Sequence, residues 1–161
     1  MSDSPNNAAI DPVDAAPTTS RGTGAEGARP TALAEALSTH VSTLELDQYR
    51  GGYTPGAFSG RECELHALLG GTGIFDRGYR ARIEVRGEDR SRWLNGMLTN
   101  NVQDLALGEG NYNFVLNAQG RIQGDCQTFR LADRLLLETD RNQVPALLAH
   151  LDHFIIMDDV E

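Results

Sequence analysis

Long apolar runs and lysine are both missing from this 161-residue sequence, in which all fourteen basic residues are arginine. A helix that crosses a bilayer needs about 20 consecutive apolar residues, so the sequence predicts no membrane partner. The first thirty residues contain no apolar segment of the secretory type, and Asp3, Asp11 and Asp14 precede the first arginine. These features argue against a secretory signal and against an arginine-rich transit peptide.

Cysteine is scarce, and acidic residues outnumber basic ones. Cys63 and Cys126 share no short spacing, which argues against a disulfide framework or a zinc site and favours a reducing, cytoplasmic setting. His150 and His153 stand three apart, but two such ligands without a third do not predict a metal site. The formal net charge of −9 would repel phosphate backbones, so no nucleic-acid partner is expected.

Composition divides the chain into three parts. Residues 1–30 are mainly small and polar and cannot bury enough apolar surface to offset the entropy of ordering, so they are predicted to be a disordered tail. Residues 31–72 are predicted to be a helical lead-in and a Gly-rich loop. The elements expected there are a helix over Thr31–Val41, a loop over Gly51–Gly60, and a helix that Ser59 caps and that ends at Leu69.

Residues 73–161 carry the densest signals for secondary structure. Their periodicities predict strands over Ile74–Asp76, Tyr79–Val85 and Arg134–Thr139, helices over Glu88–Leu98 and after a cap at Asp140 or Asn142, a hairpin around residues 116–125, and a last strand from Ile155. We therefore predict an α+β fold, a mostly antiparallel sheet with flanking helices on one face. Leu94 and Phe114 are predicted core residues, and Cys126 is predicted to be a buried thiol.

The stretch LNAQGRIQGD, Leu116–Asp125, is a turn followed by a strand with a polar side. Gly120 suits the positive φ that a tight turn needs. Beyond it, Arg121, Gln123 and Asp125 alternate with less polar residues. This polar side is either solvated or the floor of a binding site.

Two registers are open for this hairpin. A bulge at the turn pairs Leu116 with Ile122 and Tyr112 with Cys126, and it places Asp125 on the face opposite Tyr112. A two-residue loop instead pairs Tyr112 with Asp125, as a shared pocket would require. A slip of one residue decides between them.

Several short motifs follow one another from Gly73 onward. They are Gly-Ile-Phe-Asp, then Val-x-Gly ending at Gly87, then Leu-Thr-Asn-Asn-Val from Leu98, then Gly-x-x-x-Tyr-x-x-x-Leu-Asn and Gly-x-Ile-x-x-Asp. In this order and spacing, residues 73–161 resemble the folate-binding N-terminal domain of the aminomethyltransferase superfamily. That superfamily includes the T-protein of the glycine cleavage system and the YgfZ-like proteins. The resemblance implies a partial domain of this type, the front portion of a longer protein.

The resemblance also implies a tetrahydrofolate site on the hairpin. Asp125 takes the position of the T-protein's catalytic acid, beside the N5 nitrogen of tetrahydrofolate. Tyr112 takes the position of a tyrosine that lines the pterin pocket, and Asn117 lies at the turn beside it. A flat, donor-rich pterin needs an aromatic wall and carboxylate or amide acceptors, and a carboxylate near N5 can place a proton or stabilise positive charge.

The sequence departs from the T-protein pattern next to Asp125. Where the T-protein carries Gly-Gly and a pair of acids, this chain has Gly120 followed by Arg121, and Gly124 followed by Asp125. This form is more similar to the YgfZ-like proteins, which bind folate and assist iron–sulfur enzymes, although their Lys-Gly-Cys-(Tyr/Phe)-x-Gly-Gln signature does not occur here.

The favoured prediction is a YgfZ-like tetrahydrofolate-binding protein that assists iron–sulfur cluster assembly or repair, with folate and iron–sulfur proteins as partners. The alternatives are a folate-dependent aminomethyltransferase of the glycine cleavage type and a fragment that binds nothing by itself. Because the later domains of such proteins are not in the matched segment, the chain alone is not expected to be catalytically competent.

Overall fold

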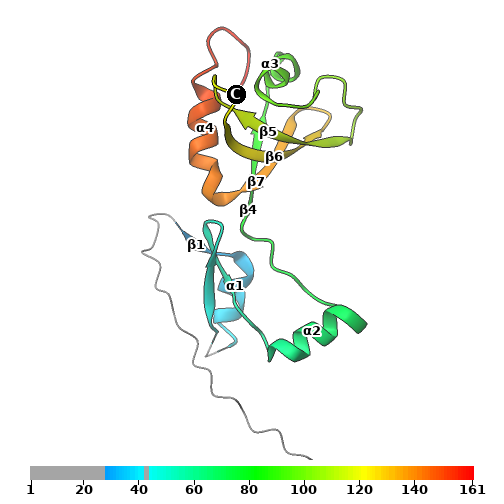
Figure 1. Ribbon diagram of the computed structural model, residues 1–161, viewed down its shortest axis with the longest axis vertical. Helices are drawn as coiled ribbons and strands as arrows, with labels where there is room; N and C mark the ends of the chain where they lie inside the picture. The colour runs from blue at the N-terminus through cyan, green and yellow to red at the C-terminus, as the bar shows by residue number, and fades with distance from the viewer. Residues whose placement is uncertain (1–27, 42–43) are drawn as a thin grey trace, which may run out of the picture.

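The computed structural model describes residues 28–41 and 44–161. In Figure 1 a larger sheet with helices α3 and α4 forms the upper part of the molecule, and α1, α2 and a smaller sheet form the lower part. The predicted disordered tail lies outside the described residues up to residue 27. Arg29–Pro30, at its end, form the short strand β1, because their backbone pairs with a strand of the smaller sheet. The prediction of disorder is therefore wrong for Arg29 and Pro30.

The smaller sheet has the strand order β1–β3–β2. β3 (Gly52–Pro55) is parallel to β1 and antiparallel to β2 (Leu46–Tyr49). Arg50 and Gly51, with φ of 47° and 87°, form the tight turn between β2 and β3. The prediction of a loop over Gly51–Gly60 is therefore wrong in its first half, because its glycines belong to a hairpin turn and to the start of a strand.

Two helices accompany the smaller sheet. α1 (Ala32–Ser38) lies within its predicted range. α2 (Arg61–Gly70) begins after Gly60 rather than after the predicted cap Ser59. The cause is local, since the Ser59 amide donates a hydrogen bond of 3.0 Å to the Glu64 carboxylate and so lies before the helix instead of starting it. Each helix of the described ranges is too short or too polar to span a bilayer.

The larger sheet has four strands in the order β4–β7–β6–β5, each antiparallel to its neighbours. These strands are β4 (Arg80–Val85), β5 (Gly110–Leu116), β6 (Ile122–Arg130) and β7 (Leu135–Asp140). The helical elements are α3 (Arg90–Met97), the short 3₁₀ helix η1 (Arg141–Gln143) and α4 (Val144–Asp152). The predicted α+β fold, a mostly antiparallel sheet with flanking helices, is confirmed.

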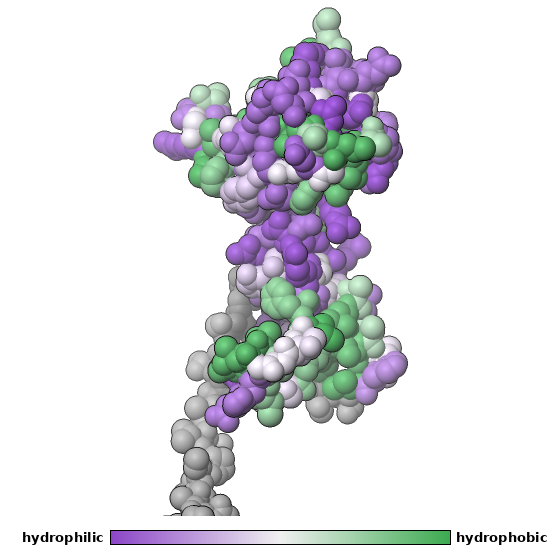
Figure 2. Space-filling model, turned by 90° about the vertical axis from the view of Figure 1, so that its right-hand side faces the viewer, coloured by the Kyte–Doolittle hydropathy of each residue, from purple (hydrophilic) through white to green (hydrophobic). Residues whose placement is uncertain are grey.

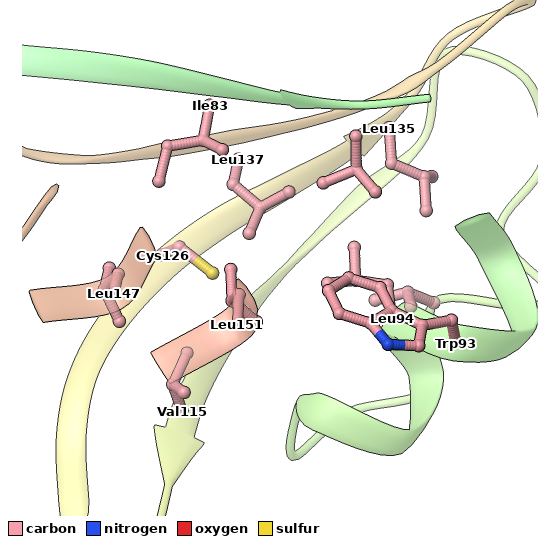
Figure 3. Packing of buried hydrophobic residues seen from close by; sticks show 11 residues of the cluster. Ile83, Trp93, Leu94, Val115, Cys126, Leu135, Leu137, Leu147 and Leu151 are labelled. Atoms are coloured by element: carbon pink, nitrogen blue, oxygen red, sulfur yellow. The ribbon is translucent and has the colours of Figure 1, made fainter. Parts of the chain in front are cut away.

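The core lies between one face of this sheet and the helices α3 and α4. Figure 3 shows Leu94 and Trp93 of α3 and Leu147 and Leu151 of α4 pointing toward the buried face of the sheet. Leu94 is fully buried, as predicted. The remaining buried apolar residues come from all four strands and from the loop after α3: Ile83, Val85, Val102, Val115, Cys126, Leu135 and Leu137. No helix of the described residues covers the opposite face of the sheet, which we call the open face.

Two predicted strands do not form in the described residues. The segment Ile74–Asp76 pairs with no strand, and its Phe75 side chain is exposed. The segment from Ile155 bends at residues 156–158, so it cannot run straight along a sheet edge. Its last residue nevertheless exchanges two backbone hydrogen bonds with Arg86, of 2.8 and 3.3 Å, just beyond the end of β4.

Arg50 and Asp140 join the two sheets. Asp140, at the end of β7, is only 4% exposed, and its carboxylate accepts hydrogen bonds from Arg50 and from Arg80, both of 2.6 Å. A buried carboxylate needs such partners because desolvation of an unpaired charge is costly. The two arginines therefore satisfy Asp140, and Arg50 ties the turn of the smaller sheet to the larger one.

Candidate functional site

The β5–β6 hairpin combines features of both predicted registers. Leu116 pairs with Ile122, as the bulged alternative requires. The register then shifts between Val115 and Leu116, so that Phe114 pairs with Asp125. Tyr112 consequently pairs with neither of its two predicted partners. The extra residue in β6 is Gln123, and an insertion of this kind moves every later side chain to the other face.

The face of β5 that carries Phe114 points away from the core, contrary to the prediction for Phe114. Asn113 and Val115 are fully buried, whereas Tyr112 and Phe114 are 47% and 37% exposed. Phe114 is therefore not a core residue. Asp125 shares the outward face with both aromatic rings. The two-residue loop also placed Asp125 and Tyr112 on one face, but by pairing them directly, whereas here the bulge at Gln123 brings them together. Cys126 is fully buried, as predicted, and its burial raises the pKa of the thiol.

Asn113 can occupy the core because its amide is satisfied there. Its Oδ1 accepts a hydrogen bond from the Asn100 amide (2.8 Å), and its Nδ2 donates to the Thr128 hydroxyl (3.2 Å) and to the Asn111 side chain (2.7 Å). A buried amide with full partners costs little, whereas an unpaired one is expensive. With Asn113 on the buried face of β5, its neighbours Tyr112 and Phe114 lie on the open face.

Asp125 is held by hydrogen bonds on each side of its carboxylate. The Tyr112 hydroxyl donates to Oδ2, and the Gln143 amide donates to Oδ1, both at 2.8 Å. The main chain of Asp125 is fixed as well, since its amide donates to Gln143 Oε1 (2.8 Å) and its carbonyl accepts from the Thr139 hydroxyl (2.7 Å). Each carboxylate oxygen can accept a further bond. The carboxylate is thus held in one orientation by hydrogen bonds.

Tyr112 and Phe114 form the aromatic part of the open face. Their rings meet edge to face, with centroids 5.3 Å apart and an interplanar angle of 83°. The hydrogen bond to the Asp125 carboxylate, with burial as a smaller cause, raises the pKa of Tyr112 above its ordinary value. The phenol therefore keeps its proton and acts as a donor to the acid at neutral pH.

Gln143 is the site residue that sequence reasoning missed. It lies on η1, 18 positions after Asp125, and no local pattern connects the two. Gly124 is a sequence feature connected with this contact, since an added Cβ there would lie 2.7 Å from Gln143 Oε1 and 2.8 Å from the Leu147 side chain. A glycine at position 124, where the T-protein pattern has an acid, thus leaves room for the Gln143 side chain.

Asn117 is placed apart from Tyr112 and Asp125. Its Oδ1 accepts hydrogen bonds from the amides of Gln119 (3.0 Å) and Arg121 (2.9 Å), which fixes the turn at the tip of the hairpin. It lines a separate hollow of about 510 Å³ between the hairpin, the end of α3 and α4. The structure therefore brings together two of the three predicted folate-binding residues.

Metal ligation has no comparable support. His150 and His153 each stack edge to face with the Phe154 ring, at centroid distances of 5.1 Å. Among the described residues, no three His, Cys, Asp or Glu side chains are grouped closely enough to hold an ion.

Comparison with known proteins places the chain in a family. Residues 34–160 match the model of the GCVT N-terminal domain, and because this covers most of the sequence, the chain belongs to that family. The match begins before Gly73, so it includes most of α1 and the strands β2 and β3 of the smaller sheet as well.

Individual relatives match over shorter stretches. The chain is 35% identical over 96 residues to the sarcosine oxidase subunit alpha of Corynebacterium sp. strain U-96, covering 59% of this chain and 10% of that protein. It is 28% identical over 89 residues to the aminomethyltransferase of Chloroherpeton thalassium, covering 55% of this chain and 25% of that protein.

A solved structure shares the fold. The glycine cleavage system aminomethyltransferase T from Bartonella henselae superimposes with a TM-score of 0.72 at 22% identity, over 82% of this chain and 37% of that one. The chain therefore spans between a tenth and about two fifths of the length of these relatives.

Proposed function

We propose that this chain is a tetrahydrofolate-binding domain of the aminomethyltransferase type, with Asp125 as its functional acid. The observation that carries the proposal is the Asp125 carboxylate, fixed by Tyr112 and Gln143 beside an aromatic pair on an uncovered sheet face. Membership in the GCVT N-terminal domain family supports the same ligand class.

The side chains present suit a reduced pterin. Tyr112 and Phe114 offer apolar ring surface, and Asp125 offers free acceptor positions for N–H donors of the heterocycle. Bound tetrahydrofolate would supply the amine nitrogen that takes up a one-carbon unit. Asp125 would exchange a proton with a bound amine or stabilise positive charge on it, because it keeps its orientation without reorganisation.

A finer assignment is the YgfZ-like branch, in which folate binding assists iron–sulfur cluster assembly or repair. Two departures from the T-protein pattern favour it, Arg121 after the turn and Gly124 in place of the first acid. The aminomethyltransferase and sarcosine oxidase relatives favour the one-carbon transfer class instead. We therefore take the aminomethyltransferase type as the main candidate and the YgfZ-like function as the second.

Calorimetric titration with tetrahydrofolate tests the ligand. Because the open face can enclose only part of the molecule, we expect a dissociation constant from about high micromolar to millimolar, which corresponds to roughly 4–6 kcal/mol. Asp125→Asn removes the charge but keeps the shape, so affinity should fall by about tenfold, as loss of a charge-assisted hydrogen bond predicts. The free energy of unfolding should change by less than about 1 kcal/mol.

The matched control is Asp47→Asn, the same change at an exposed strand carboxylate of β2. It should leave folate affinity unchanged. Equal affinity for the wild-type chain and Asp125→Asn would make Asp125 a structural strand acid. Absence of binding to the wild-type chain would support the fragment that binds nothing by itself.

The two candidate functions separate in cells. Because the chain alone is not expected to be catalytically competent, it would replace the matching segment of a bacterial glycine-cleavage aminomethyltransferase and of a bacterial YgfZ-like protein. Each chimera would be expressed in a strain that lacks its parent protein. Restored one-carbon transfer from glycine in the first strain supports the main candidate, and restored activity of iron–sulfur enzymes in the second supports the other. Asp125→Asn should abolish the first of these effects.

A further inference from the structure

The open face of the larger sheet carries an arginine cluster on the side away from the Tyr112–Asp125 pair. Arg77, Arg80, Arg82 and Glu138 line a hollow of about 380 Å³. β4, which supplies two of these arginines, is one edge strand of the sheet, and β5, which supplies Tyr112, is the other.

The cluster has an excess of positive charge. The Glu138 carboxylate accepts hydrogen bonds from Arg77 (2.7 Å) and from Arg80 (3.2 Å), and it lies 3.9 Å from Arg82. Arg80 also binds Asp140. Arg77 and Arg82 are left to share the single carboxylate of Glu138, which Arg80 already uses. In a chain with a net charge of −9, this is a local site that favours an anion.

The two outer arginines are available to a ligand. The side chains of Arg77 and Arg82 are 63% and 70% exposed, whereas that of Glu138 beneath them is 16% exposed. The 3.9 Å separation between Arg82 and Glu138 is too long for a hydrogen bond, so the planar fork of Arg82 is free to bind a carboxylate with two parallel bonds. Figure 2 shows hydrophilic side chains gathered between the upper and lower parts of the molecule, where β4 begins in Figure 1.

The register aligns this cluster with the aromatic pair. Arg82 pairs with Glu138, Glu138 with Gln127, and Gln127 with Tyr112, so these four side chains form one row across the sheet. Neighbouring strands lie about 4.8 Å apart, which sets Arg82 and Tyr112 roughly 14 Å apart at opposite ends of the row. An elongated ligand with a flat heterocycle at one end and an anionic group at the other fits such a row.

We infer that Arg77 and Arg82 bind the glutamate carboxylates of tetrahydrofolate while its pterin lies at Tyr112 and Asp125. This inference rests on the proposed function, since it assigns the second end of the same ligand. Gln127 and Glu138 lie between the two ends, beneath the connecting aminobenzoyl group.

Two probes that share the reduced pterin test the inference, and only one of them carries the anionic end. Tetrahydrofolate and 6-methyltetrahydropterin, which lacks the aminobenzoyl-glutamate portion, are titrated calorimetrically into the wild-type chain, into Arg77→Gln/Arg82→Gln and into Arg61→Gln. Arg61 is an exposed arginine at the start of α2 and serves as the matched control. Both altered arginines of the double variant are surface residues, and circular dichroism checks that it is folded.

The wild-type chain should bind tetrahydrofolate at least about tenfold more tightly than the tetrahydropterin, because charge-assisted pairs are the strong ones. The double variant should lose this difference and keep its affinity for the tetrahydropterin, and Arg61→Gln should behave as the wild type. Tetrahydrofolate binding by the wild type should also weaken with added salt.

An unchanged preference for tetrahydrofolate in the double variant would overturn the inference while leaving the pterin site in place. The failure of the proposed function looks different. In that case the wild-type chain binds neither probe, or Asp125→Asn has no effect on the tetrahydropterin, and the assignment of the arginines falls with it.

Discussion

Tyr112 donates a hydrogen bond of 2.8 Å to Asp125, although the two residues are not paired in the β5–β6 register. Asp125 lies opposite Phe114, and Tyr112 lies opposite Gln127, so the bond runs diagonally over the open face. Diagonal neighbours on one face of a sheet are within reach of an aromatic side chain. The acid therefore takes its orientation from a neighbouring strand, and the site depends on the bulge that brings both side chains to one face.

The alkaline titration of Tyr112 reports on this bond. Its pKa is raised mainly by the hydrogen bond to Asp125, so one of the four tyrosines should ionise later than a free phenol, and Asp125→Asn should move that pKa back down. A raised folded-state pKa stabilises the fold below the unfolded-state pKa of about 10, and this contribution is lost as pH rises through the raised value. Ultraviolet absorbance followed against pH measures the tyrosine pKa values in the wild-type chain and in Asp125→Asn.

Tyr112→Phe identifies the residue in that titration. The late transition should be the one that disappears. Loss of a transition at the ordinary tyrosine pKa would show that the bond to Asp125 does not form in solution.

Gly124 and Gln143 should be coupled. Gly124→Ala places a Cβ against Gln143 Oε1 and the Leu147 side chain, so it should destabilise the fold by about 1–3 kcal/mol, as overpacking does. In a Gln143→Ala background the same change should cost at least about 0.5 kcal/mol less, because one of the two clashes is gone. Urea unfolding of the four chains gives the double-mutant cycle, and additive effects would mean that the Gln143 amide does not contact the position of a Cβ at residue 124.

Leu94→Ala and Phe114→Ala should differ strongly. Leu94 is fully buried between α3 and the sheet, and its truncation should cost about 2–5 kcal/mol. Phe114 is 37% exposed and its ring meets that of Tyr112 edge to face, so its truncation should cost about 1 kcal/mol or less. Chemical denaturation measures the free energy of unfolding of both variants. Equal losses of stability would mean that Phe114 is a core residue.

Periodicity in the sequence predicted most of the larger sheet. β4, β7, α3 and α4 lie within a few residues of their predicted ranges, because their apolar residues alternate or recur as the buried face requires. The smaller sheet was missed, since Gly52 and Pro55 resemble loop residues unless the turn at Arg50 is recognised. Its strands pair through their backbones over short stretches.

The site was predictable only in part. Tyr112 and Asp125 were identified from a family resemblance, but hydropathy placed Phe114, which shares a face with Tyr112, in the core. The polar Asn113 is buried through three partners, and two of them, Asn100 and Thr128, lie 13 and 15 positions away. Gln143 could not be found, because its relation to Asp125 exists only once β6, β7 and η1 are packed together.

Amide chemical-shift mapping with tetrahydrofolate is the most direct test of the proposed site. Nitrogen-15-labelled wild-type chain is titrated with the ligand, and the amides of Tyr112, Asp125 and Gln127 on the open face are followed together with those of Asn117 and Phe154, which lie by the separate hollow. We predict that the shifts concentrate at the first three residues and that Asp125→Asn greatly reduces them. Shifts concentrated at Asn117 and Phe154, and unaffected by Asp125→Asn, would contradict the assignment of the folate site to the open face.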